Sequence, residues 1–430
     1  MKTDQIQKVH KDWYKLDLSA IVYPTLQRRD FSSVYRLSVL LKEDIDPEIL
    51  QRAVNLTMPR FPTYKAAIRK GVFWRYLEPN DRPGPFVQED VKNPCQPMHF
   101  KGNNRYLVRI YYYRNRIALE AHHSLGDGTG GMCVLQTLTA TYLRLKGHSE
   151  IENGGFVLDI LGIPDPGELE DAYMKYANAK VCPPRPGEKT YRVRGTKEPF
   201  YTLNIIDGIM SVSEVMRVAK SYNATITEYL NSVLLYALMQ KQESEWHLTL
   251  RPVKIAMPVN LRRFFPSRTL RNFITMIYPG IDPRLGEYTF EEIVTQVHNY
   301  MRYYLNEKLL RGDITTNAET QRNPFIRIVP LFIKDLVVRQ FYTKIQDKNS
   351  SAGLTNMGAL KVPETMKPYI ERFDIYMGQP FSTRTNCAIA SFEDILTINF
   401  ASSIAETDVE RLFFRKLVQD GIHVKIESNR

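Results

Sequence analysis

The chain has 430 residues, of which 43% are hydrophobic and 24% are charged. This balance is typical of a packed globular protein long enough for two domains, and it excludes wholesale disorder. An excess of 58 Lys and Arg over 47 Asp and Glu gives a net charge of +11 and favours anionic partners: a phosphorylated cofactor, an acidic carrier protein, nucleic acid or a membrane surface.

Several classes of protein do not fit the remaining composition. The four cysteines lie far apart and form no CxxC pair, which argues against structural zinc and against a disulfide framework. The sequence has no dense Lys/Arg block and no helix-turn-helix pattern, so nucleic acid is only weakly supported as a partner. Residues 1–13 have no apolar signal-peptide core, and no run approaches the roughly 20 apolar residues of a membrane span. We expect a cytoplasmic protein without stable membrane insertion.

The first half predicts strands that lead to one helix. Residues 33–41 have the pattern of a strand, and Asp46-Pro47 is typical of a helix start, with Asp as N-cap and Pro in the first turn. Two β-rich runs, 105–113 and 116–121, predict a hairpin that ends at His122-His123. A Gly-rich turn and a helix over 132–145 follow. The paired histidines are therefore expected on a loop between a strand and a helix.

A proline-rich, charged stretch separates this half from the rest, and predicts domains over 1–165 and 200–430 joined by a linker over 166–199. In the second half, four S/T-x-x-E patterns predict capping boxes: Ser211/Glu214, Thr225/Glu228, Thr289/Glu292 and Thr407/Glu410. Residues 386–392 and 395–401 predict a second hairpin. Residues 325–342 have the pattern of a basic amphipathic helix; a core-facing helix with a solvated basic face is preferred over a membrane-surface helix.

The loop His122-His123-Ser124-Leu125-Gly126-Asp127-Gly128 carries the clearest chemistry. Adjacent residues of a strand point to opposite sides, so one histidine can face the core while the other faces a cleft. Histidine is the side chain best suited to accept a proton near neutral pH. A purely structural histidine pair is the plain alternative. A metal site of His122, His123 and Asp127 is disfavoured by this alternation. The Gly-rich segment 126–131 does not match a phosphate-binding loop, because it lacks the lysine-serine ending of such loops.

The seven-residue string matches the HHxxxDG motif of the superfamily that resembles chloramphenicol acetyltransferase. This superfamily includes alcohol acetyltransferases, polyketide-associated acyltransferases and the condensation domains of peptide synthetases. The resemblance extends over nearly the whole chain, through 258–262, Asn272-Phe273 and 354–358, and is greatest to the alcohol acetyltransferase branch. One departure is at 374–381, where Asp-Ile-Tyr-Met-Gly-Gln-Pro-Phe stands in place of the DFGWG-like string of many relatives.

The resemblance implies an α/β fold made of α+β two-layer sandwiches. Two chloramphenicol-acetyltransferase-like domains would form a V-shaped pseudo-dimer with the active-site tunnel at their interface. A strand or loop of the second domain would cross over to complete the sheet of the first.

The resemblance also implies roles for individual residues. His123 would be the general base, His122 a packing and orienting residue, and Asp127 a structural residue paired with Arg262 of the second domain. Gly128 would keep the channel open and Asn260 would support the site. Thr355, Asn356 and Ser382 are candidates for lining the substrate channel.

The function expected from these residues is transfer of an acyl group, most simply acetyl, from a CoA thioester to an alcohol, with acyl-CoA as co-substrate and neither a metal nor a bound cofactor. Two alternatives stay open. The acyl group could come from an acylated carrier protein or go to an amine, as in condensation domains, or the chain could be a non-catalytic binding protein of the same fold.

Overall fold

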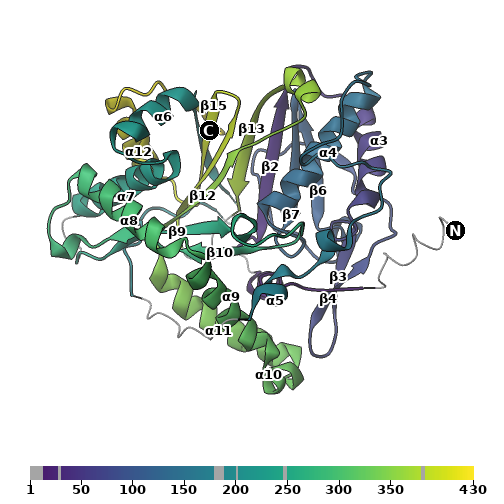
Figure 1. Ribbon diagram of the computed structural model, residues 1–430, viewed down its shortest axis with the longest axis horizontal. Coiled ribbons are helices and arrows are strands. Elements are labelled where there is room, and N and C mark those ends of the chain that lie inside the picture. The colour runs from purple at the N-terminus through teal and green to yellow at the C-terminus, as the bar shows by residue number, and fades with distance from the viewer. Residues whose placement is uncertain (1–12, 28–30, 179–187, 200–201, 246–248, 379–382) are drawn as a thin grey trace.

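The computed structural model describes residues 13–27, 31–178, 188–199, 202–245, 249–378 and 383–430. Two mixed sheets stand side by side, each with helices packed on it, as Figure 1 shows. The sheet of the first half has the order β13-β2-β7-β6-β5. These strands are β13 (Ile370–Met377), β2 (Val34–Leu41), β7 (Arg116–His122), β6 (Val108–Tyr113) and β5 (Val87–Glu89).

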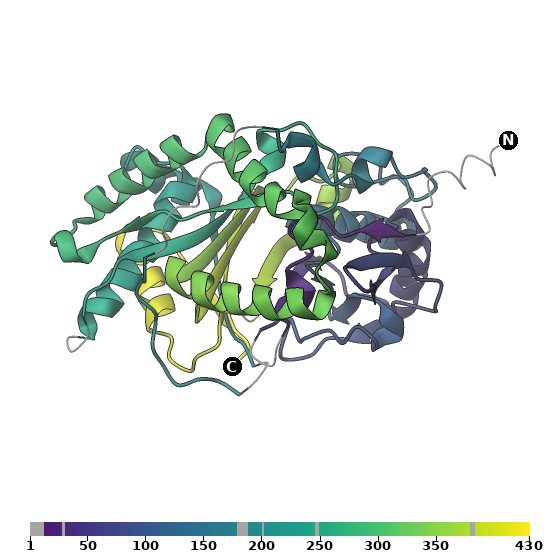
Figure 2. The ribbon, with the colours of Figure 1, turned by 90° about the horizontal axis from the view of Figure 1, so that it is seen from below.

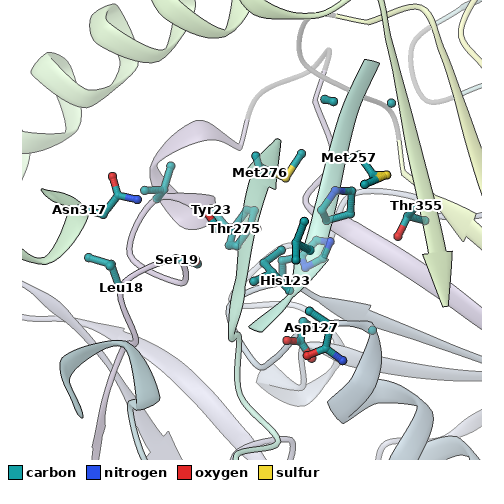
Figure 3. Close-up of a pocket in the computed structure, with 18 of the residues that line it drawn as sticks. Leu18, Ser19, Tyr23, His123, Asp127, Met257, Thr275, Met276, Asn317 and Thr355 are labelled. Carbon is teal, nitrogen blue, oxygen red and sulfur yellow. The ribbon is translucent and has the colours of Figure 1, made fainter. Parts of the chain in front are cut away.

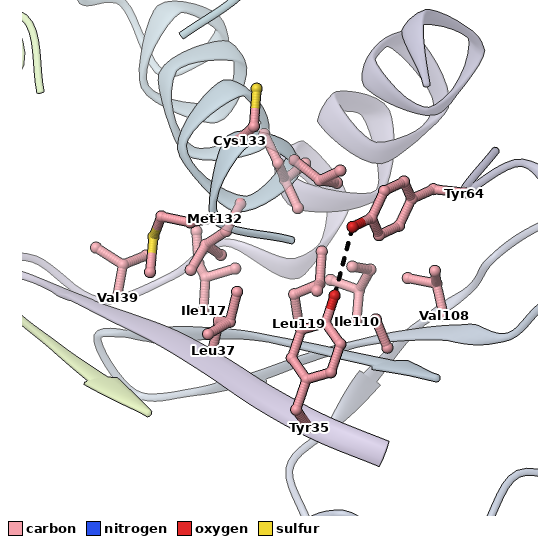
Figure 4. Close-up of a cluster of buried hydrophobic side chains, with 14 of the residues drawn as sticks. Tyr35, Leu37, Val39, Tyr64, Val108, Ile110, Ile117, Leu119, Met132 and Cys133 are labelled. Atoms are coloured by element: carbon pink, nitrogen blue, oxygen red, sulfur yellow. Dashed lines mark hydrogen bonds between the residues drawn. The ribbon is translucent and has the colours of Figure 1, made fainter. Parts of the chain in front are cut away.

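Two helices of the first half, α3 (Pro47–Thr57) and α4 (Gly128–Leu145), pack together, and α4 lies on β2 and β7. The predicted cap of α3 is confirmed, because the Asp46 carboxylate accepts the backbone N–H groups of Glu48 and Ile49. Alternate residues of the strands point at α4, as the two-residue period of a strand requires. Figure 4 shows the buried cluster that results, with Leu37, Ile117, Leu119 and Met132 among its members.

A small sheet extends the first half. It has the order β1-β4-β3, from β1 (Tyr14–Lys15), β4 (Arg75–Pro79) and β3 (Ala66–Lys70). The segment between β1 and β2 includes the short helix α2 (Tyr23–Leu26).

The second half has a larger sheet with the order β10-β9-β12-β14-β15-β8-β16. The strands are β10 (Ile274–Ile277), β9 (Val253–Asn260), β12 (Ala352–Ala359), β14 (Thr385–Phe392), β15 (Ile395–Ser402), β8 (Asn204–Ser211) and β16 (Lys425–Ser428), and β11 (Gly280–Ile281) also pairs with β9. Its core is shared with α6 (Val212–Ser221), α7 (Ile226–Ser244), α8 (Phe290–Tyr304) and α12 (Asp408–Gln419). The predicted second hairpin is β14–β15.

One strand of the second half belongs to the first sheet. β13 pairs antiparallel with β2, with Phe373 opposite Val39 and Asp374 opposite Ser38. This is the crossover that the resemblance implies. The departing string that begins at Asp374 therefore lies, up to Met377, in the strand that joins the two halves.

The predicted linker is partly structured. It contains a 3-10 turn (Pro166–Leu169) and α5 (Ala172–Tyr176), which packs on α9 (Glu307–Arg322). Tyr173 is buried in a cluster with Phe265 and Phe273 of the second half. This segment thus contributes to the packing between the halves.

Two of the four predicted capping boxes are confirmed, at Thr225/Glu228 and Thr289/Glu292. Ser211 caps the N–H of Glu214, but the Glu214 carboxylate accepts the N–H of His423 instead of returning to the cap. The prediction of a capping box at Thr407 is wrong, because the Thr407 side chain does not cap the helix. Glu410 is buried and accepts the hydroxyl of Thr385 (2.7 Å), so it is not available to the helix end.

The single helix predicted over 325–342 is also wrong. Two helices occupy it, α10 (Pro324–Ile328) and α11 (Leu331–Asn349), because Pro330 between them has no N–H to donate. Large apolar side chains of α11 face away from the core, since Phe332 is 74% and Leu336 60% exposed. α9, α10 and α11 form the lower edge of the molecule in Figure 1, and α11 crosses the near side in Figure 2. Within the described ranges, the helices are too short or too polar to cross a bilayer.

Candidate functional site

A cavity of about 2450 Å³ lies between the two halves. Figure 3 shows its lining, in which Tyr23 and His123 of the first half share one space with Met257, Thr275 and Thr355 of the second. These residues come from the segment before β2, the end of β7, and strands β9, β10 and β12. The cavity therefore requires both halves to be packed together.

His123 enters this cavity directly after the last residue of β7. Its backbone N–H donates to the carbonyl of Ser33 (2.8 Å), and its carbonyl accepts the side-chain amide of Asn272 (2.8 Å). The imidazole stacks on the ring of Tyr23, with centroids 4.8 Å apart, and meets the ring of Tyr35 at 4.6 Å. The ring is half-buried, and its Nδ1 is shielded from solvent.

The surroundings of His123 favour the neutral imidazole. Burial lowers the pKa of His123 from its usual 6.5 to about 4, although the Asp127 carboxylate, the backbone of Gly126 and Asn272 oppose that shift. A neutral imidazole has a free lone pair and can accept a proton. At neutral pH the side chain is thus in the form that a general base needs.

His122 points the other way, as the strand alternation predicts. It is buried, its ring meets the edge of Phe100, and its Nδ1 accepts the backbone N–H of Ser124 (3.2 Å). Burial and the adjacent His123 lower the pKa of His122 to about 3. His122 is not among the residues that line the cavity. Across the described ranges, we find no cluster of three His, Cys, Asp or Glu that could hold a metal ion.

Asp127 and Arg262 form the ion pair that the resemblance implies. Nη1 of Arg262 lies 2.8 Å from one carboxylate oxygen of Asp127, and Nη2 lies 3.3 Å from the other. Asp127 is also the N-cap of α4, accepting the N–H groups of Thr129 and Gly130, and it accepts the N–H of Phe273 (2.9 Å). One buried carboxylate thus fixes the start of α4 and the second half together.

Arg262 has further partners that hold it in place. Its side chain donates to the carbonyls of Thr269 (2.9 Å) and Arg271 (2.6 Å) and to the side-chain oxygen of Asn260 (3.2 Å). Asn260 in turn donates to the hydroxyl of Thr129 (3.2 Å) across the two halves. Asn260 therefore contacts both α4 and Arg262, and it also lines the cavity.

The glycines of the loop have different neighbours. A side chain at Gly128 would meet the sulfur of Met357 at 3.0 Å, at the cavity wall. A side chain at Gly130 would come within 1.9 Å of the Leu270 carbonyl, and one at Gly131 within 2.6 Å of the Tyr35 hydroxyl. Gly130 and Gly131 are thus small because protein packs against them.

Two of the three predicted channel residues line the cavity, Thr355 and Asn356 on β12. Asn356 is already engaged, since it donates to the hydroxyl of Thr227 (2.9 Å) and accepts the N–H of Gly358 (2.7 Å). Thr355 is half-buried beside the same space. Ser382 lies outside the described residues.

The residues that position His123 were missed by sequence reasoning. Asn272, which holds the His123 carbonyl, also donates to the fully buried carboxylate of Asp17 (3.1 Å). Burial raises the pKa of Asp17, opposed by the nearby Arg271. The aromatic residues Tyr23 and Tyr35 have no motif around them. Asn272-Phe273 was noticed as a pattern, but the contact with His123 joins segments that lie 149 positions apart in the chain.

No protein-family model and no curated protein sequence matches the chain. Solved structures do match it over nearly its whole length. The trichothecene 15-O-acetyltransferase TRI3 from Fusarium sporotrichioides is 12% identical, with a TM-score of 0.59, over 95% of this chain and 94% of that one. TRI101 from F. sporotrichioides, complexed with coenzyme A and T-2, is 13% identical, with a TM-score of 0.62, over 98% and 100%.

A starter condensation domain of rhizomide synthetase, in complex with C8-CoA and Leu-SNAC, is 11% identical, with a TM-score of 0.59, over 97% of this chain and 96% of that one. These likenesses confirm the α/β fold of two chloramphenicol-acetyltransferase-like halves. The chain has the fold that acetyltransferases and condensation domains share.

Proposed function

We propose that this protein is an acyltransferase that moves an acyl group from a CoA thioester to an alcohol hydroxyl, with His123 as the general base. The observation that carries the proposal is a neutral imidazole fixed at the end of β7 and open to a cavity lined by both halves. A shared interior space of this kind can hold two substrates in line with one proton acceptor.

The chemistry requires one residue to move a proton twice. Because Nδ1 is shielded, we assign Nε2 of His123 as the atom that accepts the hydroxyl proton. The alcohol oxygen then attacks the thioester carbonyl carbon and forms a tetrahedral oxyanion. When the C–S bond breaks, the imidazolium returns the proton to the thiolate, so the products are an ester and a thiol.

The thioester donor is proposed from two kinds of support. TRI101 was solved with coenzyme A, and the rhizomide condensation domain with C8-CoA. In this chain, the cavity lining includes the cationic side chains of Lys254, Arg263 and Arg302, which suit an anionic donor such as a phosphorylated thioester. Thr355, on the wall of the same cavity, is our candidate hydroxyl donor to the oxyanion.

The direct test is thiol release from acetyl-CoA in the presence of a panel of alcohols. The wild-type protein should release thiol and form the ester, and His123→Ala should lower the rate by about 10²- to 10⁴-fold, the usual contribution of a positioned base. His423→Ala is the matched control, because the His423 side chain is 94% exposed and does not line the cavity. Absence of thiol release with every alcohol, or equal rates for wild type and His123→Ala, contradicts the proposal.

A second candidate donor is an acylated carrier protein. The likeness to condensation domains and the net charge of +11 support it, since carrier proteins are acidic partners. Transfer from an acylated carrier that is faster than transfer from acetyl-CoA, and that weakens at high salt, would favour this donor over CoA. The non-catalytic alternative has less support, because the Asp127–Arg262 pair is formed and His123 is open to the cavity.

A further inference from the structure

A group of large apolar side chains is exposed along α10, α11 and the turn between β3 and β4. We call this group the apolar rim; its members are Val72, Phe73, Trp74, Phe325, Ile328, Phe332, Leu336 and Val337. Phe325 is 78% exposed and Val72 is 72% exposed. Single exposed apolar residues are ordinary on a protein surface, but a contiguous group marks an interaction site.

The turn and the helices form one surface because they are joined by hydrogen bonds. The N–H of Leu331 donates to the carbonyl of Val72 (2.9 Å), and the Lys334 ammonium donates to the carbonyl of Phe73 (2.9 Å). The turn and α10 lie on the same lower edge in Figure 1. The apolar rim thus combines parts of the chain about 260 residues apart.

The orientation of α11 is the reverse of that of an ordinary surface helix, whose polar face is expected in water. Its polar residue Asp335 points inward, where Arg75 binds both carboxylate oxygens (2.8 and 2.6 Å) and Thr25 donates to one of them (2.9 Å). Its apolar residues Phe332 and Leu336 point outward. An ion pair therefore holds the helix with its apolar face outside, which suits an apolar environment on that side.

Cationic residues accompany the apolar rim. Among the described side chains of 321–340, Arg327 and Arg339 are exposed and the Lys334 ammonium lies at the turn, whereas Arg322 is paired with Glu319 and Asp335 with Arg75. The exposed Arg327 lies within α10, and Lys70 is exposed at the end of β3. A positive surface with protruding aromatic and aliphatic side chains is complementary to a bilayer with anionic headgroups.

The apolar rim also borders the cavity that contains His123. Ile326, Val329 and Val338 of α10, α11 and their junction line that cavity, as do Phe73 and Trp74. We propose that the protein docks through the apolar rim on the surface of an anionic lipid bilayer, with Phe325, Phe332 and Leu336 inserted among the lipids. An apolar alcohol dissolved in the bilayer would then enter the cavity directly; this consequence, unlike the docking itself, rests on the function proposed above.

The test is co-sedimentation of the full chain with vesicles of phosphatidylcholine alone or with 30% phosphatidylserine. The wild-type protein should sediment with the anionic vesicles, less at high salt and less with phosphatidylcholine alone. The triple variant F325S/F332S/L336S should bind the anionic vesicles at least about tenfold more weakly, since three apolar side chains no longer insert. The control L161S/L285S changes two leucines outside the apolar rim that are 88% and 80% exposed, and it should bind like the wild type.

The other outcomes overturn the proposal. It is wrong if the wild-type protein stays in the supernatant with both vesicle types, or if the control loses binding as the triple variant does. It is also wrong if sedimentation velocity without lipid shows a dimer that the triple variant dissociates, because the apolar rim would then bind a second copy. Unchanged thermal unfolding of the triple variant shows that it is folded. Turnover of a water-soluble alcohol tests the proposed function separately, because the three substituted residues do not line the cavity.

Discussion

The two histidines of the loop have the same side chain and different environments. His122 is enclosed by the core and holds the N–H of Ser124, whereas His123 stands between two tyrosine rings at the cavity. Burial lowers the pKa of both, and the lowering for His123, to about 4, has a consequence for activity. The proposed base is therefore neutral over the whole physiological range, so small changes of pH should not switch it.

The pH dependence of kcat/KM should reflect this shift. In the proposed mechanism the working form of His123 is the neutral imidazole, so activity should be present above its pKa and be lost as pH falls through it. We expect kcat/KM to stay level from pH 8 to about 5 and to fall at lower pH, with an acid limb near 4 and well below the usual 6.5 of histidine. Initial rates across this range, with circular dichroism to verify folding, measure the limb.

A variant makes this prediction sharper. Tyr23→Ala removes a ring that stacks on His123 and admits water, so the acid limb should move up toward 6.5. A wild-type limb already between 6 and 7 would show that the imidazole is not desolvated. A limb that does not move in Tyr23→Ala would show that the tyrosine ring does not cause the shift.

The element that carries the site is the succession of β7, the loop and α4. β7 brings His123 to the cavity, and α4 begins at Asp127, whose carboxylate also binds Arg262 and the N–H of Phe273. The loop is thus held from both sides by one charged group. The Asp127 carboxylate acts through this architecture, because its hydrogen bonds go to Arg262, to Phe273 and to the start of α4.

Removal of this carboxylate should cost stability. Asp127→Ala leaves the Arg262 guanidinium buried without its counter-charge and removes the cap of α4, so the free energy of unfolding should fall by about 3–5 kcal/mol. Asp127→Asn, which keeps an oxygen for the helix cap, should cost less. Urea unfolding followed by circular dichroism measures both. An unchanged midpoint for Asp127→Ala would contradict the prediction, and His123→Ala, which leaves the ion pair intact, is the control.

On the scale of the whole molecule, the two sheets are joined through β13. Tyr376 of β13 donates its hydroxyl to Asp207 of β8 (2.9 Å), and Asn399 donates to the other oxygen of Asp207 (2.8 Å). Burial and the neighbouring Asp374 carboxylate raise the pKa of Asp207 to about 7. The junction between the halves therefore contains a carboxyl group that prefers to be protonated.

This group predicts how stability depends on pH. In the unfolded chain an aspartate loses its proton near pH 4, whereas the folded protein keeps it up to about 7. The folded state thus binds more protons between these values, and its stability should fall as pH rises through them, by up to roughly 1.4 kcal/mol per pH unit from this one group. Asp207→Asn should remove that slope and be more stable than the wild type at pH 8.

Thermal or urea unfolding of both proteins at several pH values between 4 and 8 measures the difference. Asparagine can keep both contacts, because the Tyr376 hydroxyl can also accept a hydrogen bond. The difference between the two proteins should grow from pH 4 to about 7 and then level off. A difference that is constant with pH would mean that Asp207 is ionised in the folded protein.

The sequence by itself determined the features that depend on near neighbours. Period-two alternation predicted that His122 and His123 point apart, and a cap next to a proline predicted the start of α3. The local string around Asp127 was specific enough to imply the fold and the contact with Arg262, which the tertiary structure contains. Capping boxes at Thr225 and Thr289 formed because both partners lie in one helical turn.

The tertiary structure decided whatever depends on distant parts of the chain. In the folded chain Asn272 and Tyr23 contact His123, and Glu410 binds the hydroxyl of Thr385 instead of capping its own helix. The tertiary structure also turned the apolar face of α11 outward, because Asp335 binds Arg75 some 260 residues earlier. Such outcomes result from competition between partners brought together only by folding. A local pattern predicts which contacts a side chain could make, and the packing of the two halves determines which of them it makes.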